Sequence, residues 1–296
     1  MQSARMRFIG KLAVATALLL SSANAWAQAP INLLKVGEES EITKSYTTSD
    51  QGSDGSTSSS SGHDTILERV IGAREGGVEL EYDLSRDATA EDRARSWQFP
   101  TRVFRPPSGP MKLLNRAELE TRVDGWLKTA GWSRAVCGRW IFTWNAFRIE
   151  CDPQSVIETI EEYDLRSTKL REGATYRDTM ARQPGALTRT ATSPTGEIYR
   201  ALMDVDSDVV RRSRAESDVA AGEIMRKPVT LDAALRERAK ESISGTISVA
   251  FDADSAGNVW RRTKVTKLET RKPNGVLETS TATEIVTRGP VSGRKP

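Results

Sequence analysis

Residues 245–287, "GTISVAFDADSAGNVWRRTKVTKLETRKPNGVLETSTATEIVT", contain three β-rich runs separated by two short turn sequences. Asn274-Gly275, in the second turn, is the strongest short hairpin signal in the chain. The first turn begins near Asp252 and partly matches a calcium loop. Position twelve of that loop would be Thr263 and not Glu, which favours a plain hairpin turn. Neighbouring strands joined by short turns predict an antiparallel sheet.

Further β-rich runs lie on both sides of the chain's midpoint. Two runs of helical character, 207–227 and 230–243, interrupt them in the second half, with Thr230 as the expected cap of the latter. The fold class predicted is therefore α+β, with a mainly antiparallel, curved sheet and packed helices. The Ser/Gly-rich stretch 48–62 has the composition of a flexible loop and is expected to link two strands.

The two cysteines lie in "CGRWIFTWNAFRIEC", residues 137–151. In an oxidising compartment, a lone pair of cysteines predicts one disulfide, Cys137–Cys151. If the cysteines face each other across a hairpin, Trp140 faces Arg148 and Thr143-Trp144-Asn145 forms a three-residue loop. A redox-active pair is the alternative, but the close C-x-x-C spacing is missing. Trp140, Trp144 and Arg148 form a candidate binding surface.

Helix signals flank this hairpin. Asn115 is the expected cap of the helix before it, and Asp152, followed by Pro153, of the helix after it. Together these elements predict a disulfide-stapled helix–hairpin–helix module over residues 111–165.

The N-terminus has the pattern of a secretory signal peptide. Arg5, Arg7 and Lys11 precede a short apolar run, and Ala25-Trp26-Ala27 has the small-x-small spacing of a cleavage site. Residues 1–27 are therefore expected to be cleaved near Ala27, which places the mature chain in the periplasm or outside the cell. A retained membrane anchor is the alternative, but the apolar run is about half the length that spans a bilayer. No later segment resembles a transmembrane span.

Removal of the signal peptide changes the charge balance. The precursor carries a net charge of +3, whereas the mature chain has 40 basic and 40 acidic residues. A nucleic-acid partner normally requires a basic surface, so none is expected. The high ratio of Arg to Lys is typical of a bacterial protein encoded by GC-rich DNA.

The chain after residue 27 is expected to divide into three parts. These are a β-rich segment 28–110, the module 111–165, and strands with two helices over 166–296. The first and last parts are expected to form one continuous domain.

Few residues of the chain suggest catalysis. His63 is the only histidine and lies at the edge of the Ser/Gly-rich stretch. With no second histidine and both cysteines expected in a disulfide, the sequence lacks the residues for a Ser-His-Asp triad, a Cys-His dyad or a histidine-rich zinc site. No glycine loop for phosphate is present, and no cofactor or metal is expected. The acidic run Glu161–Asp164, near a Trp-rich module, leaves a carboxylate-dependent glycan hydrolase as an alternative.

Two classes of function remain open. The favoured hypothesis is a non-catalytic, exported cell-envelope protein that binds an apolar ligand, such as a lipid, or an envelope partner protein. The alternative is the envelope-glycan hydrolase. A continuous apolar pocket would favour the first, and two carboxylates at glycosidase separation in a cleft would favour the second.

Overall fold

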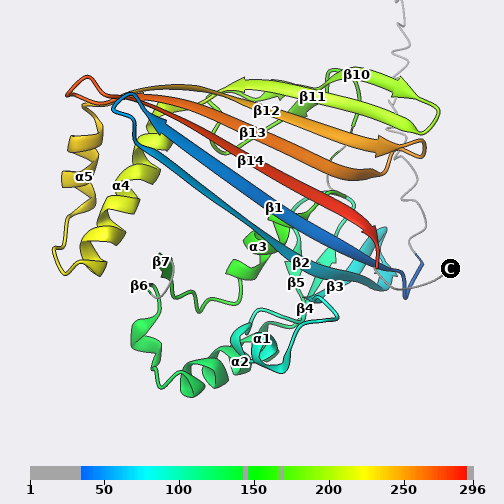
Figure 1. The fold of residues 1–296 in the computed structure, drawn as a ribbon. Coiled ribbons are helices and arrows are strands. Elements are labelled where there is room, and N and C mark those ends of the chain that lie inside the picture. The colour runs from blue at the N-terminus through cyan, green and yellow to red at the C-terminus, as the bar shows by residue number, and fades with distance from the viewer. Residues whose placement is uncertain (1–34, 143–145, 167, 169, 292–296) are drawn as a thin grey trace, which may run out of the picture. The chain divides into compact units, whose positions relative to one another are not determined.

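The computed structural model describes residues 35–142, 146–166, 168 and 170–291, so the expected signal peptide lies outside the described residues. Its main feature is a ten-stranded sheet in the order β10-β11-β12-β13-β14-β1-β2-β3-β4-β5, shown in Figure 1. Every neighbouring pair in it is antiparallel. The strands are β1 (Glu39–Gly52), β2 (Thr57–Arg74), β3 (Gly77–Leu84), β4 (Thr101–Arg105), β5 (Lys112–Leu113), β10 (Thr188–Ser193), β11 (Gly196–Asp204), β12 (Ser242–Asp254), β13 (Val259–Arg271) and β14 (Leu277–Pro290).

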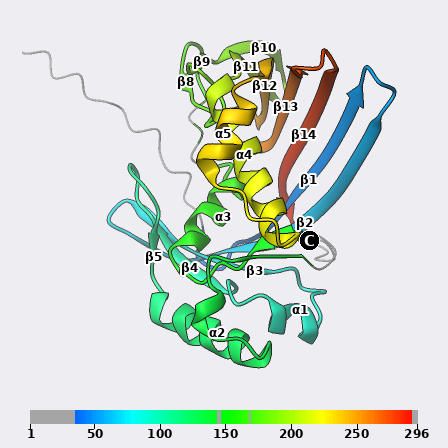
Figure 2. The ribbon, with the colours of Figure 1, turned by 90° about the vertical axis from the view of Figure 1, so that its left-hand side faces the viewer.

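The prediction of a mainly antiparallel sheet with a few helices is confirmed. The first strand pairs with the last, so both ends of the described chain lie side by side in the same sheet. Figure 2 shows β3 and β4 running across the direction of β13 and β14. The hairpin turn at Asn274-Gly275 forms as expected, with Gly275 at a φ of +86° that glycine adopts without steric cost.

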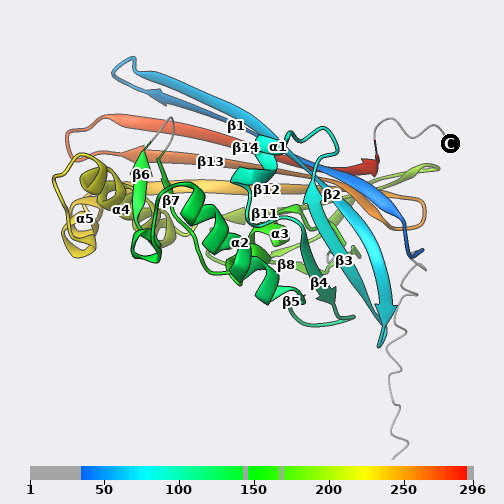
Figure 3. The same cartoon turned by 90° about the horizontal axis from the view of Figure 1, so that it is seen from below.

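The helices are α1 (Ala90–Arg95), α2 (Arg116–Thr129), α3 (Ser155–Tyr163), α4 (Ser207–Ile224) and α5 (Leu231–Arg238), with a 3-10 turn η1 (Arg134–Val136). Two small two-stranded sheets join β6 (Trp140–Phe142) to β7 (Ala146–Arg148) and β8 (Thr175–Tyr176) to β9 (Gly185–Ala186). Among the described residues no helix is long and apolar enough to cross a membrane. Figure 3 shows α2 to α5 in front of the large sheet.

Two of the three predicted cap residues, Thr230 and Asn115, occupy the N-cap positions of their helices, and Asp152 does not. Thr230 caps α5 through its side chain, as expected. Asn115 occupies the cap position of α2, but its side chain instead accepts from Arg102 N at 2.9 Å and so ties α2 to β4. Asp152 does not cap α3; its carboxylate accepts from Gln154 N in a turn, and the helix begins at Ser155.

The Ser/Gly-rich stretch 48–62 is not a flexible loop. It forms the ends of β1 and β2, which pair in register from Gln51↔Thr57 onwards. Only the turn between them is irregular, where Gly52 N donates to Ser56 O and the Asp54 carboxylate accepts from Ser56 N. Both faces of this hairpin end are largely exposed, so its strands need no apolar side chains and show no alternating pattern. Pairing to β14 holds β1 in place.

The two faces of the large sheet differ in what they contact. On β12 the odd-numbered residues, including Val249 and Phe251, are buried, whereas Ser248 and Asp252 on the other face are not. We call the first the covered face, because α3 contacts β1 and α4 contacts β12 there, and the second the open face. No described element packs against the open face in Figure 1. Burying one face and solvating the other is common in antiparallel sheets.

Candidate functional site

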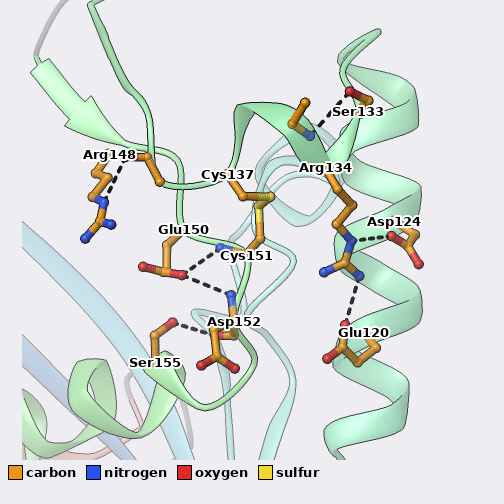
Figure 4. The surroundings of a disulfide bond; sticks show 12 residues. Glu120, Asp124, Ser133, Arg134, Cys137, Arg148, Glu150, Cys151, Asp152 and Ser155 are labelled. Carbon is orange, nitrogen blue, oxygen red and sulfur yellow. Dashed lines mark hydrogen bonds and ion pairs between the residues drawn. A yellow bond between two sulfur atoms is a disulfide. The ribbon is translucent and has the colours of Figure 1, made fainter. Parts of the chain in front are cut away.

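The hairpin that contains the cysteines forms with the predicted register. Cys137 and Cys151 are joined by a disulfide with Cα atoms 5.7 Å apart, and Trp140 is paired with Arg148 on β6 and β7. Figure 4 shows the bridge at the base of the hairpin. Ile149, next to the bridge, is buried in the main core, so the crosslink fixes the hairpin base against that core.

Polar contacts on both sides hold the bridge in place, as Figure 4 shows. The Glu150 carboxylate accepts from the backbone N–H groups of Cys151, at 2.8 Å, and Asp152, at 3.0 Å. Arg134 in η1 donates to Glu120 and Asp124 on α2, at 2.8 Å in each case. These contacts hold the chain between α2 and α3 in place, so Glu150 and Arg134 have a structural role here.

Removing the bridge is expected to destabilise the protein. The Cys137→Ala/Cys151→Ala double variant should lose about 3 kcal/mol of unfolding free energy, because the crosslink closes a loop of about 15 residues in the unfolded chain. Urea unfolding followed by tryptophan fluorescence measures the loss. Wild-type protein unfolded in reductant provides the control and should match the variant, and a loss below about 1 kcal/mol would show that the hairpin base is held by other contacts.

The structure does not join the three residues of the candidate binding surface into a site. Trp144 lies outside the described residues. The guanidinium Nε of Arg148 donates to Gly138 O at 3.0 Å, so this cation is used in a local backbone contact. Trp140 is half-buried and faces Arg148 only through the strand register.

A buried carboxylate connects four segments of the fold. Glu68 on β2 is 2% exposed and accepts from Arg166 Nε at 2.9 Å, Arg288 Nε at 3.0 Å and the Tyr82 hydroxyl at 3.0 Å. Burial raises the pKa of the Glu68 carboxyl, but the two guanidinium groups lower it more, so its pKa lies below the ordinary value. Burial also raises the pKa of Tyr82 well above its usual range. The carboxylate and the phenol therefore stay in their ordinary charge states at neutral pH.

Ion pairs cross the middle of the covered face. Arg262 on β13 donates to Glu284 on β14 at 3.0 Å, and Lys44 on β1 lies 3.6 Å from the same carboxylate. Lys264 pairs with Asp178, which precedes β9, at 2.6 Å. A lipid-carrying hollow is lined mainly by apolar side chains. These charges instead join the sheet to the segments that cover it.

The open face carries a group of apolar side chains on β11 to β14. Leu202 is 70% exposed and Trp260 is 45% exposed, and the strand registers place three half-buried aliphatic residues on the same face, Ile198, Val265 and Ile285. Trp260 is the extra residue of the β13 bulge and adjoins Arg261, which the register places on the open face opposite Asp252. The strand registers place both hydroxyl and charged side chains among this group, including Ser248, Thr263, Thr283, Arg200, Asp252 and Arg261. We call the five apolar residues the open-face apolar group.

The acids of the hydrolase hypothesis do not converge. In the run Glu161–Asp164, Glu162 pairs with Lys44 and Asp164 with Arg105, in different directions. A glycosidase acid needs a carboxyl with a raised pKa. Within the described ranges, every carboxyl whose pKa clearly departs from its ordinary value has a lowered pKa, namely Glu39, Asp54, Glu68, Asp92, Glu118, Glu197 and Asp254.

Two pockets in the described part of the chain are lined mainly by charged and other polar side chains. One, of about 370 Å³, lies between α4, α5 and the β13–β14 turn and includes Asp218 and Arg238. Another, of about 390 Å³, lies at the end of the β1–β2 hairpin. In the part of the chain that the structure describes, no cluster of three metal-ligating side chains occurs. His63 is exposed on β2 opposite Ser45, so it is solvated as expected but lies on a strand.

Sequence reasoning missed Glu68 and the open-face apolar group. The signal for Glu68 was present, because Ile66, Glu68 and Val70 share one face of a strand and the two apolar residues are core-forming. The partners Arg166 and Arg288 lie far along the chain, so they could not be assigned from the sequence.

Comparisons with known proteins show no family for this chain. No protein-family model matches, and no curated protein matches. A solved structure titled "Lipid-protein interactions in lipovitellin" has a TM-score of 0.35 and 8% identity, covering 88% of this chain and 26% of that one. This chain thus spans about a quarter of that protein's length. The attachment invasion locus protein Ail of Yersinia pestis has a TM-score of 0.19 and 6% identity, covering 86% of this chain and 99% of that one. Likenesses at these TM-scores carry no functional argument.

Proposed function

We propose that the protein is exported to the cell envelope and acts there as a non-catalytic binding protein for another envelope protein, which it contacts through the open face of its sheet. Export rests on the signal-peptide pattern of residues 1–27, and the location in the periplasm or outside the cell follows from it. The disulfide is compatible with that oxidising location. The protein's bacterial origin is part of the same proposal.

The open-face apolar group is the observation that carries this function. An exposed Trp and Leu with aliphatic neighbours, among hydroxyl and charged side chains, has the composition of a protein interface, where a few apolar anchors lie among polar residues. Leu202 on β11 is 70% exposed and Trp260 on β13 is 45% exposed, and large apolar side chains of this kind serve as anchors in protein interfaces.

An apolar small ligand is the weaker form of the proposal. The ion pairs of Arg262, Glu284 and Lys264 occupy the covered face where such a ligand would lie. We also propose that residues 111–165 form one helix–hairpin–helix module, which supports the covered face. The hydrolase alternative has less support, because Asp218 and Glu241, two carboxylates of the pocket between α4 and α5, both pair with Arg238.

Site-specific photo-crosslinking in cells tests the partner. A benzophenone amino acid at Leu202 should give one discrete adduct, and adding Trp260→Arg to the same chain should reduce that adduct about tenfold, because interface anchors act together. The benzophenone at exposed Arg236 on α5 is the matched control and should give none. An adduct that is equal from Arg236, or that is insensitive to Trp260→Arg, would reject the proposed face.

Two mass measurements test the remaining parts. The intact mass of protein from the envelope fraction should correspond to a chain beginning at Gln28, and a mass that includes residues 1–27 would reject cleaved export. Native mass spectrometry should show no lipid retained by the protein. A lipid bound in equimolar amount would favour the apolar-ligand form over the protein partner.

A further inference from the structure

We propose that residues 57–65 of β2 form an open strand edge through which two copies of this chain pair into one continuous sheet. This segment pairs with β1 on one side only. On its other side, β3 begins to pair with β2 at Ile66↔Leu84 and continues away from the segment. Within the described part of the chain, no strand continues the sheet beyond residues 57–65, and Figure 2 shows this hairpin end standing clear of the helices.

The hydrogen-bond pattern determines which backbone groups face the open edge. Gly52 N donates to Ser56 O at the start of the hairpin, and Val70 N donates to Glu38 O at its far end. In an antiparallel pair alternate residues bond to the partner strand, so the even-numbered residues of β2 face β1. The odd-numbered residues from Thr57 to Thr65 therefore direct their N–H and C=O groups to the open edge.

This edge lacks the features that normally prevent strand addition. Natural edge strands are short, bulged, covered, or protected by lysine and proline. Residues 57–65 have the sequence TSSSSGHDT, which contains no lysine or proline. The bulge of β2 lies elsewhere, between Val70 and Gly72. Thr57 to Ser61 are all exposed, and their small side chains leave room for another backbone at the spacing of paired strands.

A second copy of the same segment fits this edge in one register. The open edge begins after the hairpin turn before Thr57 and ends where β3 starts to pair, after Thr65. A strand of nine residues therefore fills it, and the same segment of a second copy has that length. Ser61 is its central residue and faces outward, so a twofold axis at Ser61 pairs every outward residue with an outward residue. Asp64 then lies opposite Ser58, a hydroxyl donor, and like charges do not meet. The covered faces of both copies lie on the same side of the joined sheet.

Replacing the outward N–H at the axis tests the pairing. Ser61→Pro removes that donor on both copies while leaving the even-numbered bonds to β1, and proline is tolerated at such an outward position. Sedimentation equilibrium of the mature chain should show a concentration-dependent dimer for wild type. We expect the Ser61→Pro dimer to dissociate at a concentration at least about tenfold higher, because two backbone hydrogen bonds are lost. Ser61→Thr keeps the donor and is the matched control.

Cysteine crosslinking tests the register. Under mild oxidation Ser61→Cys should form a covalent dimer, because the paired Cα atoms of the two copies lie within disulfide range. Ser59→Cys faces the same edge, but the two copies of residue 59 are offset by four positions, about 13 Å, and should not crosslink. Thermal unfolding of each variant verifies that it folds. A monomeric wild type at all concentrations, a Ser61→Pro dimer of unchanged affinity, or equal crosslinking at residue 59 would each overturn the proposal.

Discussion

Glu68→Gln is expected to lower the unfolding free energy by about 3–5 kcal/mol, because it removes the buried anion between two guanidinium groups. These groups would then have only the partly exposed Glu38 carboxylate nearby, 4.0 Å from Arg166 and 3.5 Å from Arg288. The carboxylate is 2% exposed and contacts Arg166 and Arg288, whose side chains are 17% and 18% exposed. The affected contacts join β2, β14 and the segment after α3, so the loss should appear in global unfolding. Urea denaturation at pH 7 measures it.

Two further variants establish the cause of that loss. Glu81→Gln is the matched control: Glu81 pairs with Arg69 at 3.1 Å on the opposite face of the same β2–β3 pair, where both side chains reach solvent. It should cost less than about 1 kcal/mol. Replacing Glu68, Arg166 and Arg288 together with methionine should recover most of the loss, because no stranded charge remains. A triple variant as unstable as Glu68→Gln would show that packing, and not charge, is responsible.

The same carboxylate makes stability depend on pH. Because the pKa of Glu68 is lower in the folded than in the unfolded state, its contribution is fully present above the unfolded pKa of about 4.3 and is lost as the pH falls through the folded value. Wild type should therefore lose more stability than Glu68→Gln between pH 7 and pH 3. Parallel curves for the two proteins over this range would contradict the shifted pKa. Other carboxyls with lowered pKa values titrate equally in both proteins.

The predictable parts of this fold are those whose signals are local. In β12 apolar residues alternate with polar ones, and short turns such as Asn274-Gly275 separate β12, β13 and β14, so the type and the pairing of these strands could be predicted. The register of the hairpin between Cys137 and Cys151 followed from the cysteine spacing and the loop chemistry alone.

The parts that sequence reasoning missed depend on distant contacts. The β1–β2 hairpin end has serine and threonine on both faces, so its sequence shows no alternation of apolar and polar residues. These residues form strands because β1 pairs with β14 on one side and with β2 on the other. Asn115 has a capping side chain, yet a buried backbone N–H of β4 competes for it. For the candidate site, the exposure of Leu202 and Trp260 depends on which sheet face the helices cover, which strand periodicity cannot decide.

Phe251→Ala is expected to cost about 3–5 kcal/mol, because the ring is fully buried on the covered face and its removal leaves a cavity. The ring packs edge-to-face on Tyr176 with centroids 5.3 Å apart, which attaches β8 to β12. Ser248→Ala, on the open face of the same strand, is the matched control and should change stability by less than about 0.5 kcal/mol. Urea denaturation of the three proteins measures both effects.

A double-variant cycle separates the ring contact from simple burial. Phe251→Leu and Tyr176→Leu, alone and combined, should show a coupling energy of about 0.5–1.5 kcal/mol. Each single variant already removes the contact between the two rings, so the double variant should lose less stability than the sum of the two. This coupling matters for function because it holds the segment before β9, which also contains Asp178, on the covered face. If this segment detached easily, the covered face would also be accessible to a partner. The open face would then no longer be the one exposed face of the sheet. Zero coupling together with a small cost for Phe251→Ala would indicate such a loosely covered sheet.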